Sequence, residues 1–237
     1  MRMLILAGGF GTRLRGVVSN VPKPLAPIGT IPFLHYQIEN WLAQGVQSFT
    51  FLLHHQFNVI NRFIDERRGS LFTGCTVQSI VEPHPLDTGG AVGFAVRQLG
   101  LEGQLLITNA DTWLGAGVRE LAITGANSMV VVQQADASRY GRVEVDETGC
   151  VRSFLEKTDR SESGWINAGM YALGAEIFSE WNGQRMSLEK DVFPKLLAER
   201  RLRAVPMESD FIDIGVPEDY FRFCRWQKGG REGKLCN

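Results

Sequence analysis

The sequence predicts an α/β protein built on a doubly wound, mostly parallel sheet with a small β-rich lobe. In the first 134 residues, short apolar runs alternate with segments whose apolar residues recur at helical spacing, a pattern typical of parallel strands joined by helices. After Ala135 this alternation stops, and short strand-like pieces separated by turns follow. Ligands of such a sheet bind beyond the carboxyl ends of its strands.

The first part of the chain is expected to alternate between strands and helices. The strands correspond to apolar runs at residues 1–6, 49–53, 75–81, 104–108 and 128–134. The helices are indicated by apolar residues three or four apart over residues 34–42, 59–66 and 88–99. Thr88 is the expected N-cap of the third helix.

The second part is expected to be richer in strands. Strands are predicted at residues 142–145, 151–155 and 165–173 and near Ala204, with a helix over residues 187–199. Pro217 suits the first position of a last helix that ends near Trp226, and the tail from Lys228 is expected to fray. We therefore expect one domain over residues 1–227, with a main lobe of about 1–134 and 200–227, a small lobe of about 135–199 and a tail of 228–237.

The composition indicates a cytoplasmic protein with neither a nucleic-acid nor a membrane partner. Lys and Arg (25) almost balance Asp and Glu (26), so the broad positive charge that binds nucleic acid or an anionic membrane is missing from the sequence. The apolar start is too short for a signal peptide, and no apolar run reaches the roughly 18 residues of a membrane span. The four cysteines lie far apart without a C-x-x-C pair, which predicts reduced thiols.

A glycine-rich segment follows the first predicted strand, L-A-G-G-F-G-T-R-L at residues 6–14. Glycines let backbone N–H groups approach an anion closely, although a tight turn alone could also explain them. The segment is neither a Walker A motif nor G-x-G-x-x-G. The second strand ends in Leu-Leu-His-His and lacks the acidic residue that binds a dinucleotide's ribose, so a dehydrogenase fits poorly.

Two cations lie close to this segment in the sequence. Arg13 belongs to it, and Lys23 stands between Pro22 and Pro24. Because two prolines restrict the backbone and exclude a helix, the lysine is expected on a stiff, extended segment. A surface lysine in a loop is the alternative.

The combination of L-A-G-G-x-G-T-R-L with P-K-P, whose lysine comes ten residues after Arg13, resembles the sugar-1-phosphate nucleotidyltransferase family. The resemblance extends to about Arg225. It is strongest to the D-glycero-α-D-manno-heptose 1-phosphate guanylyltransferases, in the segments at residues 85–91, 139–141, 166–169 and 211–220. It implies a Rossmann-like nucleotidyltransferase fold, and transfer of GMP from GTP to a heptose 1-phosphate for capsule or surface-polysaccharide synthesis.

The resemblance also implies roles for individual residues. Nucleotidyl transfer needs in-line attack on the α-phosphorus, with cations spreading the developing charge. Arg13 and Lys23 are the expected cations, and Asp111 and Asp213 the expected Mg²⁺ ligands, since Mg²⁺ takes carboxylate and phosphate oxygens. The family's Asn-Gly-Asp is here Asn-Ala-Asp; if Ala110 needs a positive φ, the metal site would be displaced.

The expected substrate contacts fall into two groups. Glu82 could accept two hydrogen bonds from guanine or one from a pyrimidine, and a solvated glutamate is the alternative. The nucleotide is expected to meet Leu6, Ala7, Gly8, Gly9, Gly11, Thr12, Arg13, Glu82, Thr88, Gly89 and Asn109. The sugar phosphate is expected to meet Tyr140, Gly141, Glu156, Lys157 and Asn167.

The same residues are compatible with other functions. A mannose-1-phosphate guanylyltransferase, or an enzyme for another hexose phosphate, carries the same motifs. A non-catalytic nucleotide-binding subunit would have no chemical need for Arg13, Lys23, Asp111 and Asp213 together. The histidines are expected to be structural or exposed, and Trp41, Trp181, Phe193 and Phe221 to lie in the core or at subunit contacts, as in a homodimer.

Overall fold

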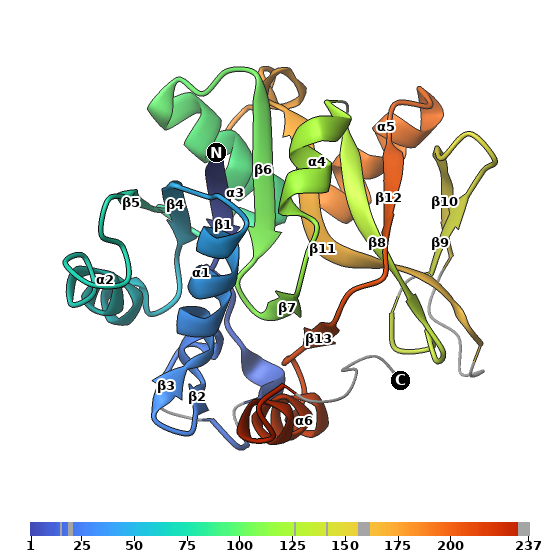
Figure 1. The fold of residues 1–237 in the computed structure, drawn as a ribbon. Coiled ribbons are helices and arrows are strands. Elements are labelled where there is room, and N and C mark those ends of the chain that lie inside the picture. Colours follow the sequence, from blue (N-terminus) through green and yellow to red (C-terminus); the bar gives the residue numbers. More distant parts are fainter. Residues whose placement is uncertain (15, 19–20, 126, 141, 156–161, 232–237) are drawn as a thin grey trace. The chain divides into compact units, whose positions relative to one another are not determined.

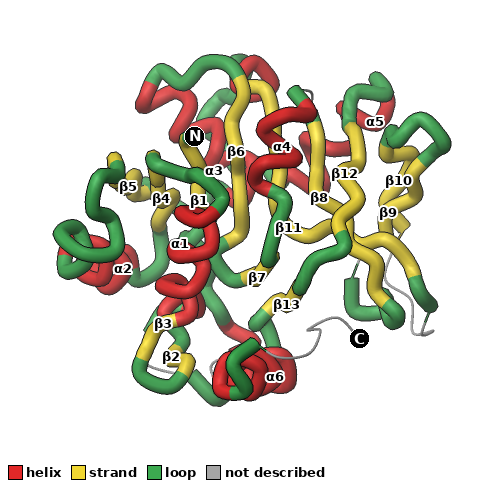
Figure 2. The backbone as a smooth tube through the Cα atoms, in the orientation of Figure 1, coloured by secondary structure: helices red, strands yellow, loops and turns green. Residues whose placement is uncertain are grey.

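The computed structural model describes residues 1–14, 16–18, 21–125, 127–140, 142–155 and 162–231, and its elements are drawn in Figures 1 and 2. The chain divides into two compact units. The first unit comprises residues 1–85, 108–113 and the described residues from 212 onward, and the second comprises residues 86–107 and 114–211. The expected division into a main and a small lobe stays a prediction.

A parallel ladder of three strands forms the centre of the first unit. Strand β4 (Ser48–Leu53) lies between β1 (Arg2–Leu6) and β5 (Thr76–Val81), with Met3 opposite Phe49 and Leu52 opposite Ile80. The side chains from Phe49 to Leu53 are all buried, as expected for a strand covered on both faces. Helices α1 (Phe33–Ala43) and α2 (Phe57–Asp65) connect these strands, which confirms the predicted alternation here.

The segment between β1 and α1 contains short elements that were not predicted. Two 3₁₀ turns, η1 (Thr12–Leu14) and η2 (Lys23–Leu25), precede a small hairpin of β2 (Pro27–Ile28) and β3 (Ile31–Pro32). Lys23 therefore lies in a helical turn, and the expected extended conformation holds only for Pro22, whose φ is −60° and ψ 146°. Proline at either side still fixes the backbone that carries the lysine.

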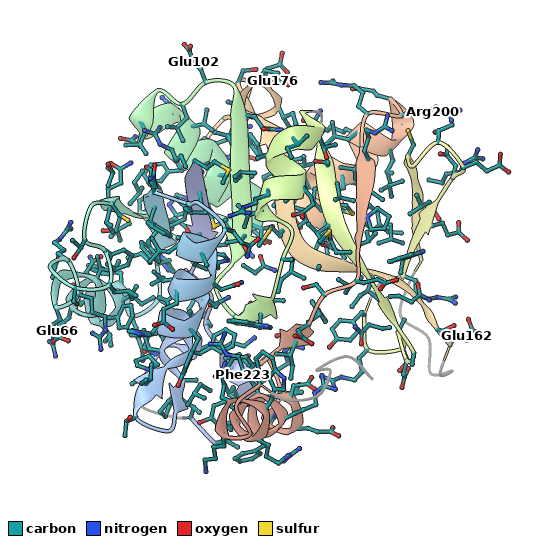
Figure 3. The ribbon with its side chains drawn as sticks, in the orientation of Figure 1. Glu66, Glu102, Glu162, Glu176, Arg200 and Phe223 are labelled. Carbon is teal, nitrogen blue, oxygen red and sulfur yellow. The ribbon has the colours of Figure 1, made fainter. Side chains whose placement is uncertain are left out.

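Helix α6 (Pro217–Lys228) closes the first unit and begins at Pro217 as predicted. Its buried face packs on residues from the start of the chain. The ring of Phe223, labelled in Figure 3, meets Phe33 edge to face at 4.8 Å and Trp113 at 5.5 Å. The buried cluster comprises Leu14, Ala26, Ile28, Phe33, Trp113, Ile212, Ile214, Tyr220, Phe223 and Trp226. Apolar packing thus brings segments from both ends of the sequence together.

Three strands pass from one unit into the other: β6 (Gln104–Asn109), β7 (Thr112–Leu114) and β13 (Phe211–Asp213). Within the first unit, the turn between β6 and β7 is held on both sides. The amide of Ala110 donates to the carbonyl of Leu6 at 3.1 Å, and the amide of Ile214 donates to the carbonyl of Asp111 at 3.1 Å. Asp111 consequently lies next to the end of β1 and next to the segment after β13.

The second unit is a mixed sheet with helices. Strand β8 (Ser128–Gln134) pairs antiparallel with β11 (Gly164–Gly174) and parallel with β12 (Arg203–Met207). Strands β9 (Arg142–Val145) and β10 (Val151–Leu155) form an antiparallel pair. The remaining elements are α3 (Asp87–Leu99), the unpredicted α4 (Val118–Thr124), the turns η3 (Ala175–Phe178) and η4 (Leu188–Val192), and α5 (Phe193–Ala198).

The start of α3 corrects the expectation that Thr88 is its N-cap. The helix begins at Asp87, and its cap position, Leu86, offers no side-chain acceptor. The hydroxyl of Thr88 instead accepts a hydrogen bond from the amide of Leu188 at 2.9 Å. A contact with a residue 100 positions away has therefore replaced the local cap that the sequence suggested.

The large aromatic residues separate into core and surface. Trp41 and Phe193 are buried, as expected for core residues, whereas Phe221 is 46% exposed. None of the helices in the described part of the chain combines the length and the apolar character needed to cross a bilayer. The oligomeric state stays a prediction.

Candidate active site

The glycine-rich segment leaves β1 alongside the end of β4. The amide of Ala7 donates to the carbonyl of Leu52 at 3.0 Å, and the carbonyl of Gly8 accepts from the amide of His55 at 3.3 Å. A Cβ at Gly8 would lie 3.0 Å from Glu82 Oε1 and 3.2 Å from the amide nitrogen of His54, so a side chain there would be crowded. Gly11 has a φ of +59°, the left-handed region that glycine adopts without strain.

The Lys23 ammonium joins two carboxylates that come from distant parts of the chain. Its Nζ lies 2.6 Å from Asp111 Oδ2 and 3.2 Å from Asp213 Oδ1. The lysine side chain is 8% exposed, compared with 36% for Asp111 and 27% for Asp213. The structure therefore brings three of the predicted site residues into direct contact, and the surface-lysine alternative is wrong.

Both carboxylates are oriented by nearby donors. The amide of Gly215 donates to Asp213 Oδ1 at 2.7 Å, and the hydroxyl of Thr112 donates to Asp111 Oδ1 at 3.4 Å. A Cβ at Gly215 would lie 2.8 Å from both Asp213 Oδ1 and Lys23 Nζ. The absence of a side chain at this residue thus leaves the space in which lysine and aspartate meet.

The charge state of Lys23 follows from two opposing effects. Burial is the strongest single influence and disfavours the ammonium, but attraction to Asp111 and Asp213 and the hydrogen bonds to them together outweigh it. The pKa of Lys23 is therefore raised above its ordinary value, and the side chain is charged at neutral pH. The cluster contains two negative charges and one positive charge.

Ala110 fits its position without strain. The non-glycine residues with positive φ in the described part of the chain are Gln56, Asp87, Arg200 and Arg231. Ala110 is not among them, and it is buried with its amide bonded to Leu6. The replacement of the family's glycine by alanine therefore gives no reason to expect a displaced Asp111.

A buried glutamine supports the turn that carries Asp111. The side-chain amide of Gln37, from α1, donates to the carbonyl of Thr112 at 2.7 Å and lies 3.5 Å from the carbonyl of Asn109. Gln37 is 2% exposed. Sequence reasoning missed it, although a polar residue between the apolar Leu34 and Ile38 was a usable signal.

Glu82, directly after β5, is 7% exposed, so the alternative of a solvated glutamate is wrong. Its amide donates to the carbonyl of Leu53 at 2.8 Å, and its side chain reaches the space that the missing Cβ of Gly8 leaves. The half-exposed ring of Phe10 lies beside the rings of His54 and His55, at centroid distances of 6.0 and 5.0 Å. This group of rings beside the glycine segment was not predicted.

Arg13 is exposed on η1 and forms no ion pair with any residue that the structure describes. It is therefore available to an anionic ligand, but the structure does not bring it into contact with the Lys23 cluster. Leu6, Ala7, Gly9, Thr12 and Asn109 are the other expected nucleotide contacts in the first unit. Their contacts with nucleotide stay predictions.

The remaining predicted contacts belong to the second unit. A Cβ at Gly89 would lie 3.0 Å from the carbonyl of Met186, so helix packing alone explains this glycine. The side chain of Asn167 is held by Tyr171 and by the amide of Gly169, each at 2.9 Å. Tyr140 packs its ring edge to face on Phe211. Gly141, Glu156 and Lys157 lie outside the described residues, and binding of the sugar phosphate stays a prediction.

The charged cluster offers two carboxylates, those of Asp111 and Asp213, as ligands for a metal ion. Among the residues that the structure describes, no group of three or more His, Cys, Asp or Glu side chains could hold a metal ion. Asp111 and Asp213 supply two carboxylates around the same cation, Lys23 Nζ. Two carboxylates, with phosphate and water oxygens completing the shell, is the way Mg²⁺ is usually bound at nucleotide sites.

Comparison with known proteins gives consistent results in sequence and structure. The sequence profile of the nucleotidyl transferase family matches residues 2–226. The D-glycero-α-D-manno-heptose 1-phosphate guanylyltransferase of Campylobacter jejuni is 35% identical over 94% of this chain and 98% of its own length. The mannose-1-phosphate guanylyltransferase 1 of Arabidopsis thaliana is 33% identical over 93% of this chain, which spans 63% of that protein.

The solved structure of HddC from Yersinia pseudotuberculosis, complexed with GMP-PN, superposes with a TM-score of 0.83 at 31% identity, covering 94% of this chain and 98% of HddC. The UDP-glucose pyrophosphorylase from Acinetobacter baumanii superposes with a TM-score of 0.75 at 18% identity, over 99% of this chain and 95% of that one, and shows the fold alone. The predicted fold class is confirmed. The chain belongs to the nucleotidyl transferase family.

Proposed function

We propose that this enzyme transfers GMP from GTP to D-glycero-α-D-manno-heptose 1-phosphate, giving GDP-heptose and pyrophosphate for capsule or surface-polysaccharide synthesis. A phosphate oxygen of the sugar phosphate attacks the α-phosphorus, and the bond from that phosphorus to the bridging oxygen of the β-phosphate breaks. The observation that carries the proposal is the contact of Lys23 with Asp111 and Asp213, in a chain of this family. The similarity to named heptose guanylyltransferases supports the choice of sugar.

Cations in this site would stabilise the triphosphate and the charge that develops on it. Lys23 is held as an ammonium beside the glycine segment, where the Cβ that Gly11 lacks would come within 3.1 Å of the lysine Cβ. Arg13 is exposed on the same segment. Preorganised donors of this kind stabilise a transition state without reorganising during the reaction.

Asp111 and Asp213 would hold Mg²⁺. The fit rests on the cation that they already share, because Lys23 Nζ is within hydrogen-bond distance of both carboxylates. When bound, Mg²⁺ would supply positive charge that neutralises part of the charge on the phosphates. The protein orients the two carboxylates with hydrogen bonds from the amide of Gly215 and the hydroxyl of Thr112.

Glu82 is the proposed guanine contact. A carboxylate can accept two hydrogen bonds, and the Watson–Crick edge of guanine offers two adjacent N–H groups. The closeness of Glu82 to Gly8 supports a base bound beside the glycine segment. We also propose a cytoplasmic location, where nucleoside triphosphates are available, and leave the homodimer as a prediction.

A pyrophosphate-release assay tests the proposal directly. It crosses four nucleoside triphosphates with mannose, glucose and D-glycero-α-D-manno-heptose 1-phosphates. We expect the highest kcat/KM for GTP with the heptose phosphate. Highest activity with mannose 1-phosphate would identify an enzyme for a hexose phosphate. If no pair of substrates gave turnover, the protein would instead be a non-catalytic nucleotide-binding subunit.

Asp111→Asn tests the metal ligand in the same assay with the best substrate pair. The amide keeps a hydrogen-bond acceptor for Lys23 but loses the negative charge that Mg²⁺ needs, so we expect turnover to fall at least about 10²-fold, as when a preorganised charge is lost. Asp65→Asn, at an exposed residue paired with Arg68, is the matched control. Turnover within about threefold of the control would remove Asp111 from the site.

A further inference from the structure

Lys23 occupies the place where the two carboxylates converge. Its Nζ is bonded to Asp111 Oδ2 at 2.6 Å and to Asp213 Oδ1 at 3.2 Å, so both carboxylates point an oxygen at the same atom. The lysine is almost fully buried by its surroundings. A second cation that binds these carboxylates must therefore share them with Lys23 or displace it.

We propose that Lys23 and the divalent cation compete for Asp111 and Asp213, so that Lys23 makes metal binding depend on the arrival of the triphosphate. This inference rests on the proposed function, in which the two aspartates are metal ligands. A Mg²⁺ ion bound by Asp111 Oδ2 would lie about 2.0–2.1 Å from it. The ammonium already bound to that oxygen would then face a divalent cation at very short range, and the two would repel each other.

The backbone of Lys23 cannot move away easily, but the end of its side chain can. Pro22 and Pro24 fix the main chain on both sides, and the Cβ packs next to Gly11. The four-carbon stem beyond the Cβ is flexible, although the missing Cβ of Gly215 leaves only the room that Nζ already uses, since a Cβ there would lie 2.8 Å from it. Competition would therefore be resolved by movement of the terminal part of the lysine side chain.

The charge balance explains why nucleotide would matter. One ammonium and two carboxylates leave a single net negative charge to attract a metal. If a metal displaced the ammonium while no nucleotide was bound, a mostly buried charge would lose both of its partners, which is strongly unfavourable. A triphosphate offers that ammonium new acceptor oxygens, so the carboxylates become available to the metal at the same moment.

A Mn²⁺ titration of nucleotide-free protein tests the inference without relying on turnover. Free Mn²⁺ is measured by its electron paramagnetic resonance signal. Lys23→Met and Lys23→Gln remove the competing charge. We expect both variants to bind Mn²⁺ at least tenfold more tightly than the wild type. Lys195→Met, at an exposed lysine on α5, is the matched control and should bind like the wild type.

Two further measurements locate the effect and check the fold. Adding Asp213→Asn to Lys23→Met should abolish the gain in Mn²⁺ affinity, because the gain depends on that carboxylate. Without metal, Lys23→Met should melt at a lower temperature than the wild type, since the two carboxylates then repel each other. Mn²⁺ should raise its melting temperature more than that of the wild type, a result that only folded protein can give.

Equal or weaker Mn²⁺ binding by both Lys23 variants would overturn the inference and make Lys23 a support for the carboxylates. The proposed function is judged separately, by pyrophosphate release from wild-type protein. Turnover without a change in Mn²⁺ affinity would overturn only the inference. A change in affinity in a protein without turnover would overturn only the proposed function.

Discussion

Gly215→Ala places a methyl group inside the contact between Lys23 and Asp213. The new Cβ would lie 2.8 Å from Lys23 Nζ and 2.8 Å from Asp213 Oδ1, closer than carbon normally approaches nitrogen or oxygen. The φ of Gly215 is outside the positive region, so alanine meets no backbone strain there. The effect of the substitution is confined to the two charged groups.

The size of the effect follows from what must move. Ordinary van der Waals contact would need a shift of roughly half an ångström, and overpacking of this kind costs about 1–3 kcal/mol in the free energy of unfolding. For a chain of this length that corresponds to a melting temperature lower by about 2–12 °C. Because a misplacement of ~1 Å can cost 10²-fold in rate, we expect kcat to fall between about 10- and 100-fold.

Urea unfolding and pyrophosphate release measure the two effects in parallel, with Gly69→Ala as the control. Gly69 also lacks a positive φ, and a Cβ there meets nothing within 4 Å. The control should keep its kcat and change the free energy of unfolding by no more than about 0.5 kcal/mol. If Gly215→Ala behaves like Gly69→Ala in both assays, the close contact of Lys23 with Asp213 does not exist in the working enzyme.

Two other substitutions give distinct results. Burial, followed by the influence of Cys224, raises the pKa of Tyr220 to about 12, and the Tyr220 hydroxyl donates to the carbonyl of Pro27. The folded state thus favours the neutral phenol. The stability that this preference contributes is complete below about pH 10 and is lost between about pH 10 and 12. Between about pH 10 and 12, the free energy of unfolding of Tyr220→Phe should fall by up to about 2–3 kcal/mol less than that of the wild type, as measured by urea unfolding at each pH. The same fall with pH in both proteins would contradict this. Ala110→Gly should cost about 0.5–1 kcal/mol of unfolding free energy through backbone entropy with kcat unchanged, because Ala110 has no positive φ; a several-fold rise in kcat would mean that the alanine does displace Asp111.

The parts of the fold that were predictable are those whose signal is local. The run from Phe49 to Leu53 is apolar at every residue but Thr50 because β4 is covered on both faces, and Pro217 marks the start of α6 within the sequence itself. The hairpin of β2 and β3 was missed because a strand of two residues has no periodicity to detect. Helix α4 was also missed, although Gly117 and Gly125 bound its seven residues.

The site was predictable in its residues but not in its geometry. The two prolines beside Lys23 indicated a fixed lysine, and the resemblance to the family suggested Asp111 and Asp213. The direct ion pairs join residues 88 and 190 positions apart, and no local pattern encodes such a contact. The roles of Gln37 and Gly215 depend on the same long-range packing, which explains why sequence reasoning did not assign them.

The geometry of the charged cluster must be imposed by its apolar surroundings. The attraction of Lys23 to the two carboxylates outweighs the cost of burying it, but ion pairs removed from water lose much of their attraction to desolvation, and the two carboxylates repel each other. The cluster around Phe33, Trp113 and Phe223 is buried and predominantly apolar, and it joins the residues just after Lys23 to those just after Asp213. Hydrophobic burial thus supplies the free energy that holds the like-charged carboxylates at one point. Because the two carboxylates carry one more negative charge than Lys23 neutralises, the site can accept a further cation.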